Sequence, residues 1–307
     1  MQTVLITGGS GLVGKALSVA LLAKGYKVII LSRSLNSKPA IANLSYAYWH
    51  VKKQQIDLAA VQQADHIVHL AGAGVVAKKW TPAYQKEIVE SRTDSSRLLI
   101  DMLKNNACKV KTVVSASAIG WYGADQSPVK PFIETDEFDH SFLGNTCKLW
   151  EAGIEPVTSL GIRLVICRIG IVLSNDGGAL AEFKKPIKFG AAAILGNGKQ
   201  LISWIHIDDL CRLFTEAIEN DALQGIYNAV SPSPVSNKEL TLTLAKAMNG
   251  KFYLPIYVPA FVLKWMMGER SIEILKSTTV SCKKIMDTHF QFNYNTIEQA
   301  LVNLIKK

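Results

Sequence analysis

The chain has 307 residues, of which 49% are hydrophobic and 19% are charged. This composition excludes a disordered chain and predicts one large domain or two coupled ones. A net charge of +9 would suit nucleic acid, an anionic membrane or a phosphorylated small molecule, but the Lys and Arg residues are scattered and gather only in pairs such as Lys52 and Lys53. We therefore expect a small-molecule substrate, and neither nucleic acid nor a membrane as partner.

The cysteines and the first residues indicate the compartment. The five cysteines form no CxxC pair and lie among apolar residues, which is typical of free thiols in a reducing cytosol. A strand is expected from Thr3, which leaves no room for a signal peptide, and no apolar run reaches the length of a membrane span. The sequence thus predicts a cytoplasmic protein.

The N-terminal half alternates short apolar runs with segments of helical periodicity. We expect strands at residues 3–7, 27–31, 66–70, 111–116 and 163–168, and helices at 12–24, 82–105 and about 147–159. Such alternation predicts an α/β fold with a Rossmann-type doubly wound parallel sheet.

After Gly170 the pattern changes. Glycines crowd residues 176–199, and the last third mixes helices with loops bounded by proline, which predicts a smaller C-terminal α+β substrate-binding domain. We assign residues 1–170 to the Rossmann domain, with 203–232 returning to it. Residues 171–202 and 233–307 are then the smaller domain.

A glycine-rich loop follows the first strand and opens the first helix. Its sequence, TGGSGLVG over residues 7–14, has the context that turns a weak glycine motif into a strong one. The early glycines allow a tight turn and a close approach of backbone to a pyrophosphate, and the last lets the helix pack on the strand. The predicted cofactor-binding residues here are Thr7, Gly8, Gly11, Leu12, Val13 and Gly14.

The end of the second strand indicates which dinucleotide binds. An Asp or Glu there would hold the ribose 2′-hydroxyl of NAD, but this chain has Ser32, Arg33 and Ser34. A guanidinium suits a 2′-phosphate, so we predict NADP(H), with Arg33 and Ser34 as ligands. The alternative is that Arg33 stacks on the adenine and accepts either cofactor. Leu70, Ala71 and Gly72, at the end of the strand expected at 66–70, are expected beside the cofactor or are small only for packing.

These residues, with others along the whole chain, resemble the extended short-chain dehydrogenase/reductase superfamily, and within it the atypical group called epimerase family proteins. The resemblance also rests on the segments KWT (79–81), ESR (90–92), SAIGWYG (117–123), WE (150–151), DGG (176–178), GNG (196–198), SWIHIDDL (203–210), YNAVSP (227–232) and VPA (258–260). It implies NADP(H) binding and a C-terminal domain for nucleotide-sugars or other carbonyl and hydroxyl substrates. It also allows a homodimer.

In the family, catalysis uses a Tyr and a Lys spaced YxxxK, with a Ser after the fifth strand. By this resemblance Ser117 and Lys148 are catalytic candidates and Ser115 lies on the cofactor side. The residue four before Lys148, however, is Gly144, so the usual acid/base is missing. Tyr122 either replaces it or, with Trp121, only walls the pocket.

Other polar and aromatic residues are candidates for substrate contact. Arg168, Lys199 and Trp204 are the predicted substrate residues; Arg92 and Gln200 could also meet an anion, although Arg92 equally suits a buried ion pair and Trp204 the core. His206 with Asp208 and Asp209 is expected to cap a helix, and we predict no metal site.

Two functions remain from the sequence. The first is an NADP(H)-dependent oxidoreductase or epimerase-like enzyme acting on a small hydroxyl or carbonyl compound. The second is a non-catalytic NADPH-binding regulator or redox sensor, which the missing tyrosine favours.

Overall fold

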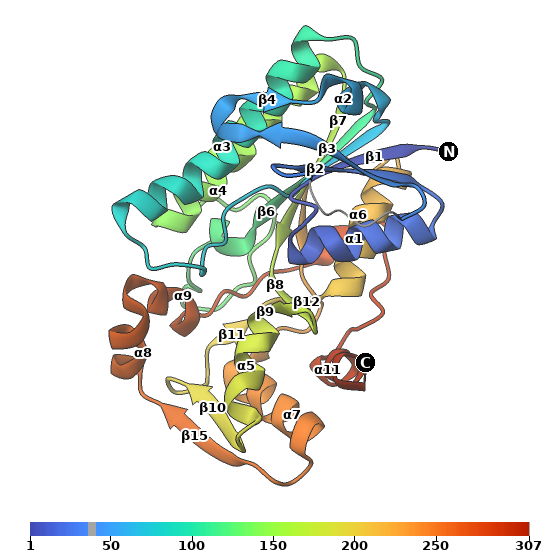
Figure 1. The fold of residues 1–307 in the computed structure, drawn as a ribbon. Helices are drawn as coiled ribbons and strands as arrows, with labels where there is room; N and C mark the ends of the chain where they lie inside the picture. The colour runs from blue at the N-terminus through green and yellow to red at the C-terminus, as the bar shows by residue number, and fades with distance from the viewer. Residues whose placement is uncertain (36–40, 307) are drawn as a thin grey trace.

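A computed structural model describes residues 1–35 and 41–306 of the chain and has at its centre one eight-stranded sheet (Figure 1). The sheet order is β13-β7-β6-β5-β1-β2-β3-β4, and every neighbouring pair is parallel except β3 and β4. Strand order runs outward from β1 in both directions, so the topological switch point lies between β1 and β5. The strands are β1 (Thr3–Thr7), β2 (Lys27–Ser32), β3 (Leu44–His50), β4 (Gln55–Ile56), β5 (His66–His69), β6 (Thr112–Ala118), β7 (Arg163–Ile169) and β13 (Gly225–Ala229).

Helices cover both faces of this sheet, which explains why its central strands, such as β1 and β5, are buried along their whole length. Val4 and Ile6 of β1 face the cluster that includes α1 and α6, whereas Leu5 faces the cluster that includes α2, α3 and α4, as the pleat requires. The covering helices are α1 (Leu12–Ala23), α2 (Leu58–Gln63), α3 (Pro82–Asn105), α4 (Phe142–Ile154) and α6 (Ile207–Glu219), with short 3₁₀ turns η1 (Val51–Lys53), η2 (Ile119–Trp121) and η3 (Glu155–Leu160).

Most of the remaining elements form a smaller lobe below the large sheet in Figure 1, whereas α10 (Lys283–Met286) packs against β13 of the large sheet. Its three small sheets pair β10 with β15, β11 with β14, and β12 with β8 and β9. The elements are β8 (Ile171–Ser174), β9 (Gly177–Gly178), α5 (Ala179–Ile187), β10 (Ala191–Leu195), β11 (Leu201–Ile202), β12 (Trp204–His206), β14 (Val235–Ser236), α7 (Asn237–Asn249), β15 (Leu254–Val258), α8 (Ala260–Met267), η4 (Gly268–Arg270), α9 (Ser271–Leu275) and α11 (Ile297–Lys306). Between visits to this lobe the chain returns to the large sheet through α6 and β13.

The predicted fold class is confirmed, with local differences. The predicted strands are all present, and α3 begins and ends where its period indicated. The helix expected at 147–159 instead begins at Phe142, because Ser141 caps it by accepting a hydrogen bond from the Gly144 N–H (3.4 Å), and it passes into η3 after Ile154. The domain boundaries stay a prediction. Over residues 1–35 and 41–306, no helix is long and apolar enough to span a membrane.

Candidate functional site

The glycine loop between β1 and α1 is shaped by close backbone contacts. Gly8 has φ +68°, and a Cβ there would lie 2.7 Å from the Leu70 carbonyl oxygen; one at Gly14 would lie 2.5 Å from the Gly8 carbonyl oxygen. Gly11 is the N-cap of α1 and supplies no side chain to cap it. The first N–H groups of α1 are therefore left for a ligand, and an anion suits them by charge and geometry.

Beside the loop, Thr7 ties β1 to β5. Its hydroxyl accepts hydrogen bonds from the N–H groups of Leu70 (3.0 Å) and Ala71 (3.1 Å) and lies 2.8 Å from His69 Nδ1. Burial lowers the pKa of His69 to about 3, so the ring is neutral. The two N–H groups already use the acceptor positions of the Thr7 hydroxyl, so its own proton is donated to His69 Nδ1. The ring proton of His69 is then on Nε2, which faces Ser96 Oγ at 3.2 Å. Thr7 thus supports the wall of the site through its buried side chain.

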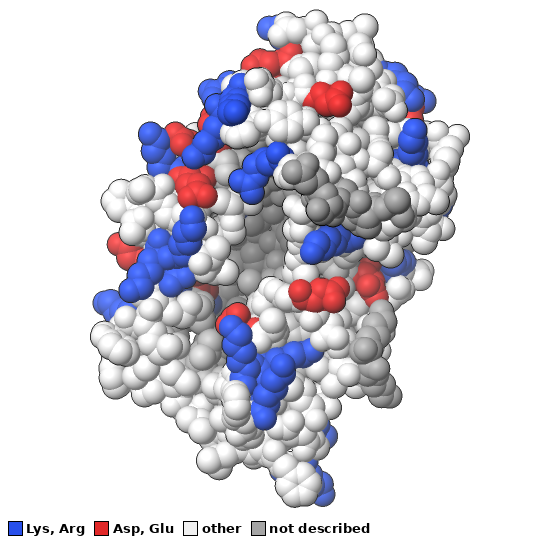
Figure 2. Space-filling view, viewed as in Figure 1, with Lys and Arg blue, Asp and Glu red and all other residues white. Residues whose placement is uncertain are grey.

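Arg33 and Ser34 follow β2 at the same edge of the sheet, and both are exposed. Among the described residues no carboxylate pairs with Arg33, and no Asp or Glu precedes Asp57 in the chain. The first βαβ unit itself therefore carries no acidic side chain, and Lys24 at its far end pairs with Glu219. Figure 2 shows this face of the molecule hollowed between the two lobes, with Lys and Arg side chains along the rim.

The position of the missing tyrosine is filled by backbone. Gly144 is buried in the first turn of α4, and a Cβ there would overlap the carbonyl oxygen of Asp139. One turn later, Lys148 is exposed, with Nζ 4.2 Å from the centre of the Phe138 ring. The helix therefore retains the lysine but has no room for any side chain where the acid/base would stand.

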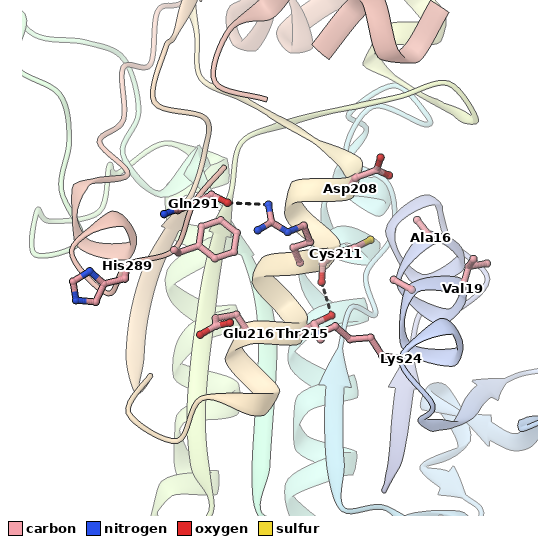
Figure 3. Close-up of a pocket in the computed structure, with 12 residues that line it drawn as sticks. Ala16, Val19, Lys24, Asp208, Cys211, Thr215, Glu216, His289 and Gln291 are labelled. Atoms are coloured by element: carbon pink, nitrogen blue, oxygen red, sulfur yellow. Dashed lines mark hydrogen bonds between the residues drawn. The ribbon is translucent and has the colours of Figure 1, made fainter. Parts of the chain in front are cut away.

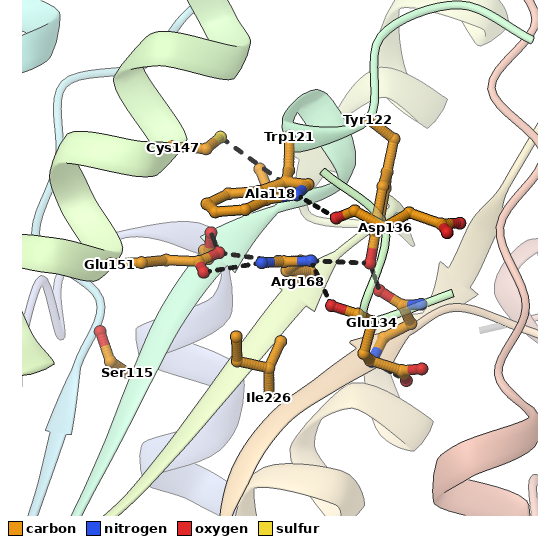
Figure 4. A network of polar contacts seen from close by, with 12 residues as sticks. Ser115, Ala118, Trp121, Tyr122, Glu134, Asp136, Cys147, Glu151, Arg168 and Ile226 are labelled. Atoms are coloured by element: carbon orange, nitrogen blue, oxygen red, sulfur yellow. Dashed lines mark hydrogen bonds and ion pairs between the residues drawn. The ribbon is translucent and has the colours of Figure 1, made fainter. Parts of the chain in front are cut away.

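Ser117, Tyr122 and Arg168 belong instead to one buried polar network (Figure 4). Arg168 is 1% exposed and binds Glu151 through two hydrogen bonds, Nε to Oε1 (2.8 Å) and Nη2 to Oε2 (2.9 Å). Ser117 Oγ donates to the same carboxylate (2.6 Å). The guanidinium carbon also lies 3.7 Å from the centre of the Trp121 ring. The structure places Arg168 in this buried network, paired with Glu151, and its contact with a substrate stays a prediction.

Tyr122 closes the other end of the network. Its hydroxyl donates to Asn228 Oδ1 (2.6 Å) and accepts from Arg168 Nη1 (3.0 Å), and the side chain is 3% exposed. Burial raises the pKa of Tyr122 to about 12, against a smaller lowering by Arg168. This placement favours the alternative that Tyr122 is part of the wall.

Three further predicted residues have mixed outcomes. Trp204 is fully buried, with Nε1 donating to the Ser233 carbonyl (2.8 Å), which favours the alternative that it belongs to the core. Ser115 is also fully buried, and its hydroxyl donates to the Ala116 carbonyl (3.2 Å). Lys199 is exposed and lines a shallow pocket of about 400 Å³.

The segment 206–209 is a helix start. His206 Nδ1 accepts from the Asp208 N–H (3.0 Å), and the Asp209 carboxylate accepts from the N–H groups of Asn293 (2.9 Å) and Tyr294 (3.0 Å). The predicted capping role is confirmed for His206. Within the described part of the chain, no group of three or more His, Cys, Asp or Glu could hold a metal ion.

A second pocket, of about 550 Å³, lies over α1 and α6 (Figure 3). Ala16 and Val19 of α1 line one side, and His289 and Gln291 line the other, across α6. No residue of the glycine loop lines it, so it is separate from the candidate cofactor site.

Parallel topology with a switch point, together with a glycine loop at the start of α1, defines a Rossmann-type dinucleotide-binding protein. Residues 4–229 match the model of the NAD dependent epimerase/dehydratase family, and residues 258–304 match a domain of unknown function, DUF1731. The chain belongs to the NAD-dependent epimerase/dehydratase family.

Individual relatives agree with this. The chain is 34% identical to the epimerase family protein YfhF of Bacillus subtilis (strain 168), over 99% of this chain and 98% of the relative. Among solved structures, it is similar to the human epimerase family protein SDR39U1 (isoform 2) with NADPH, at 28% identity, TM-score 0.86 and full coverage of both chains. A nucleoside-diphosphate sugar epimerase from Corynebacterium glutamicum is 28% identical with TM-score 0.77, over 99% of this chain and 58% of that one.

Sequence reasoning missed two members of the network. The sequence marks Glu151 only as part of a motif and Asn228 only within the segment 227–232, but Glu151 accepts from Arg168 and Asn228 accepts from Tyr122. An Arg at the end of a buried strand favours a carboxylate nearby, and this signal could have indicated a partner such as Glu151.

Proposed function

We propose that this chain binds NADP(H) at the glycine loop and transfers hydride to or from a small hydroxyl or carbonyl compound, as an oxidoreductase or an epimerase-like enzyme. The observation that carries the proposal is the loop itself: Gly8 and Gly14 make contacts that no side chain would permit, and α1 begins without a side-chain cap. The two solved structures at 28% identity, one with NADPH and one a nucleoside-diphosphate sugar epimerase, support the cofactor and the nucleotide-sugar class of substrate.

The residues present fit the cofactor. The N–H groups at Leu12 and Val13 would hold the pyrophosphate, Arg33 and Ser34 the 2′-phosphate, and Ala71 and Gly72 would lie along the ribose. When bound, NADP(H) supplies or accepts the hydride. Lys148, exposed on α4, would hold the nicotinamide ribose. Ser117 and Tyr122 would shape the wall from within the buried network.

Arg33→Ala should weaken NADPH binding by about tenfold or more and leave NADH binding nearly unchanged. The reason is that a guanidinium makes charge-assisted hydrogen bonds only to the extra phosphate. Titration of both cofactors by isothermal calorimetry measures the two changes. Lys27→Ala, which removes a cation at the opposite end of the same strand, is the control and should change neither. Equal losses for NADPH and NADH would reject NADP(H) specificity.

The activity is tested by label transfer. The protein is incubated with NADPH deuterated at the transferable nicotinamide position and a metabolite extract, and deuterated products are sought by mass spectrometry. A labelled product that requires the protein is the expected result, and it would also identify the substrate class. Tight NADPH binding with no transfer of label would instead leave only an epimerase that recycles its bound hydride, or a non-catalytic protein.

The second candidate, a non-catalytic NADPH-binding regulator or redox sensor, is favoured by one specific observation. The Asp139 carbonyl occupies the space of any side chain at residue 144, and the hydroxyls of Ser117 and Tyr122 are engaged with buried partners. Such a protein needs the glycine loop but no proton donor.

A further inference from the structure

Arg92 is a buried cation directly behind the wall of the candidate cofactor site. It lies on α3 and is 8% exposed. Its Nη1 donates to the carbonyl oxygens of Ala73 (3.1 Å) and Ile88 (2.8 Å), and its guanidinium carbon lies 4.7 Å from the centre of the Trp150 ring. A Cβ on Gly72 would lie 3.0 Å from that carbon, so the guanidinium packs against the Gly72 backbone.

No carboxylate neutralises this charge. Residues 1–35 and 41–306 include every Asp and Glu of the chain, and none of them forms an ion pair with Arg92. The ion pair that the sequence allowed for Arg92 is therefore absent. Two titratable neighbours are uncharged at neutral pH: burial lowers the pKa of His69 to about 3 and raises that of Cys147 to about 11.

Arg168, which is also buried, differs from Arg92 in having a carboxylate partner. At Arg168, burial alone would lower the pKa, but the hydrogen bonds and charge of Glu151 outweigh it and the pKa rises. At Arg92 burial dominates and the pKa falls. A buried charge without a counter-charge raises the free energy of the folded protein. An anion bound near Arg92 would lower that free energy.

The position of Arg92 connects it to the glycine loop. The guanidinium packs on Gly72, the same segment continues back to Leu70, and the Leu70 carbonyl lies against Gly8. The contacts are short and Arg92 itself is 8% exposed, so its charge is screened less than a charge in open water, although Gly72 is exposed on its outer side.

We propose that Arg92 is a positioning residue and the buried counter-charge of the bound dinucleotide: its positive charge is compensated only when the anionic phosphates of the cofactor occupy the glycine loop. This inference rests on the proposed NADP(H) function. Through Ala73 and Gly72, Arg92 also fixes the segment against which the cofactor lies.

The test compares two charge states at one position. Arg92→Gln keeps a donor for the Ala73 carbonyl but removes the charge, and Arg92→Lys keeps the charge. We expect R92Q to weaken NADPH binding about tenfold and R92K to stay within about threefold of wild type. Arg97→Gln is the matched control, because Arg97 lies on the same helix but is 62% exposed and paired with Asp94. It should bind NADPH like wild type.

Thermal melting with and without saturating NADPH gives the second readout. The rise in Tm on adding NADPH should be smaller in R92Q than in wild type, while the ligand-free proteins melt within a few degrees of each other. A merely structural role would instead lower the ligand-free Tm in both Arg92 variants and leave the NADPH Kd of the folded proteins unchanged. If R92Q does not fold, Arg92→Met takes its place with the same expected order of affinities.

The outcomes separate the two proposals. If wild type and R92Q bind NADPH equally, the Arg92 proposal is wrong and the NADP(H) function stands. If R92K loses as much affinity as R92Q, the charge is not what acts, and the Arg92 proposal is again wrong. If wild type binds neither NADPH nor NADH, the proposed function fails and the inference fails with it.

Discussion

Glu151→Ala should destabilise the protein by about 3–5 kcal/mol, because it leaves the Arg168 guanidinium buried without a counter-charge. Arg168 is 1% exposed and its two hydrogen bonds to Glu151 span both carboxylate oxygens. The substitution also removes the acceptor for the Ser117 hydroxyl. Since a domain of this kind is stable by about 5–15 kcal/mol in total, the loss takes a large part of it. Urea unfolding followed by circular dichroism measures the change.

Two variants show whether the buried pair is responsible. Asp221→Ala breaks the Arg163–Asp221 pair, in which the Asp221 side chain is 95% exposed, and should cost no more than about 1 kcal/mol. Adding Arg168→Met to Glu151→Ala should recover part of the loss, because the uncompensated charge is then gone. A loss for Glu151→Ala no larger than that for Asp221→Ala would contradict the role given to the network.

The features that could be predicted from the sequence are those determined by residues close together in the chain. The glycine loop between β1 and α1 is one, since both its flanking elements have clear periodicity. The helix start after His206 is another, because a cap and the N–H group it accepts from are two residues apart. Asp57 likewise accepts from the Ala60 N–H and caps α2, as its position before a short helix indicates.

The network around Arg168 could not be predicted, because its members come together only in the folded sheet. Ser117 and Glu151 are 34 residues apart, and Tyr122 and Asn228 are 106 apart. The sequence around Ser117 in β6 would be the same whether its hydroxyl faced a substrate or a buried carboxylate. The two alternatives for Trp204 stayed open for a related reason. An aromatic in β12 can line a cleft or fill the core, and only the fold brings the Ser233 carbonyl to its Nε1.

β3 was also missing from the predicted elements. Its sequence, LSYAYWH, alternates in burial, and it lies between β2 and the two-residue strand β4 at the end of the sheet. Such a half-buried strand lacks the continuous apolar run that marks the central strands.

Gly144→Ala should destabilise the protein by about 1–3 kcal/mol, although alanine is the better helix former by about 1 kcal/mol. The new Cβ would overlap the Asp139 carbonyl oxygen, and backbone at that point cannot rotate away as a side chain could. Gly144→Tyr, which would restore the YxxxK spacing with Lys148, should be less stable still and should not gain turnover in the label-transfer assay. The Asp139 backbone, in the loop that precedes α4, occupies the space that a tyrosine at residue 144 would need.

Gly153→Ala is the control on the same helix. Its Cβ would meet Ser96 Cβ at 3.4 Å, an ordinary contact, so the substitution should be neutral or stabilising by up to about 1 kcal/mol. Urea unfolding of the two alanine variants side by side separates packing from helix propensity, which is the same for both. If Gly144→Ala is as stable as Gly153→Ala, the segment before α4 can yield, and a side chain at residue 144 could be accommodated. The absence of the acid/base would then reflect only the residue present and not the shape of the site.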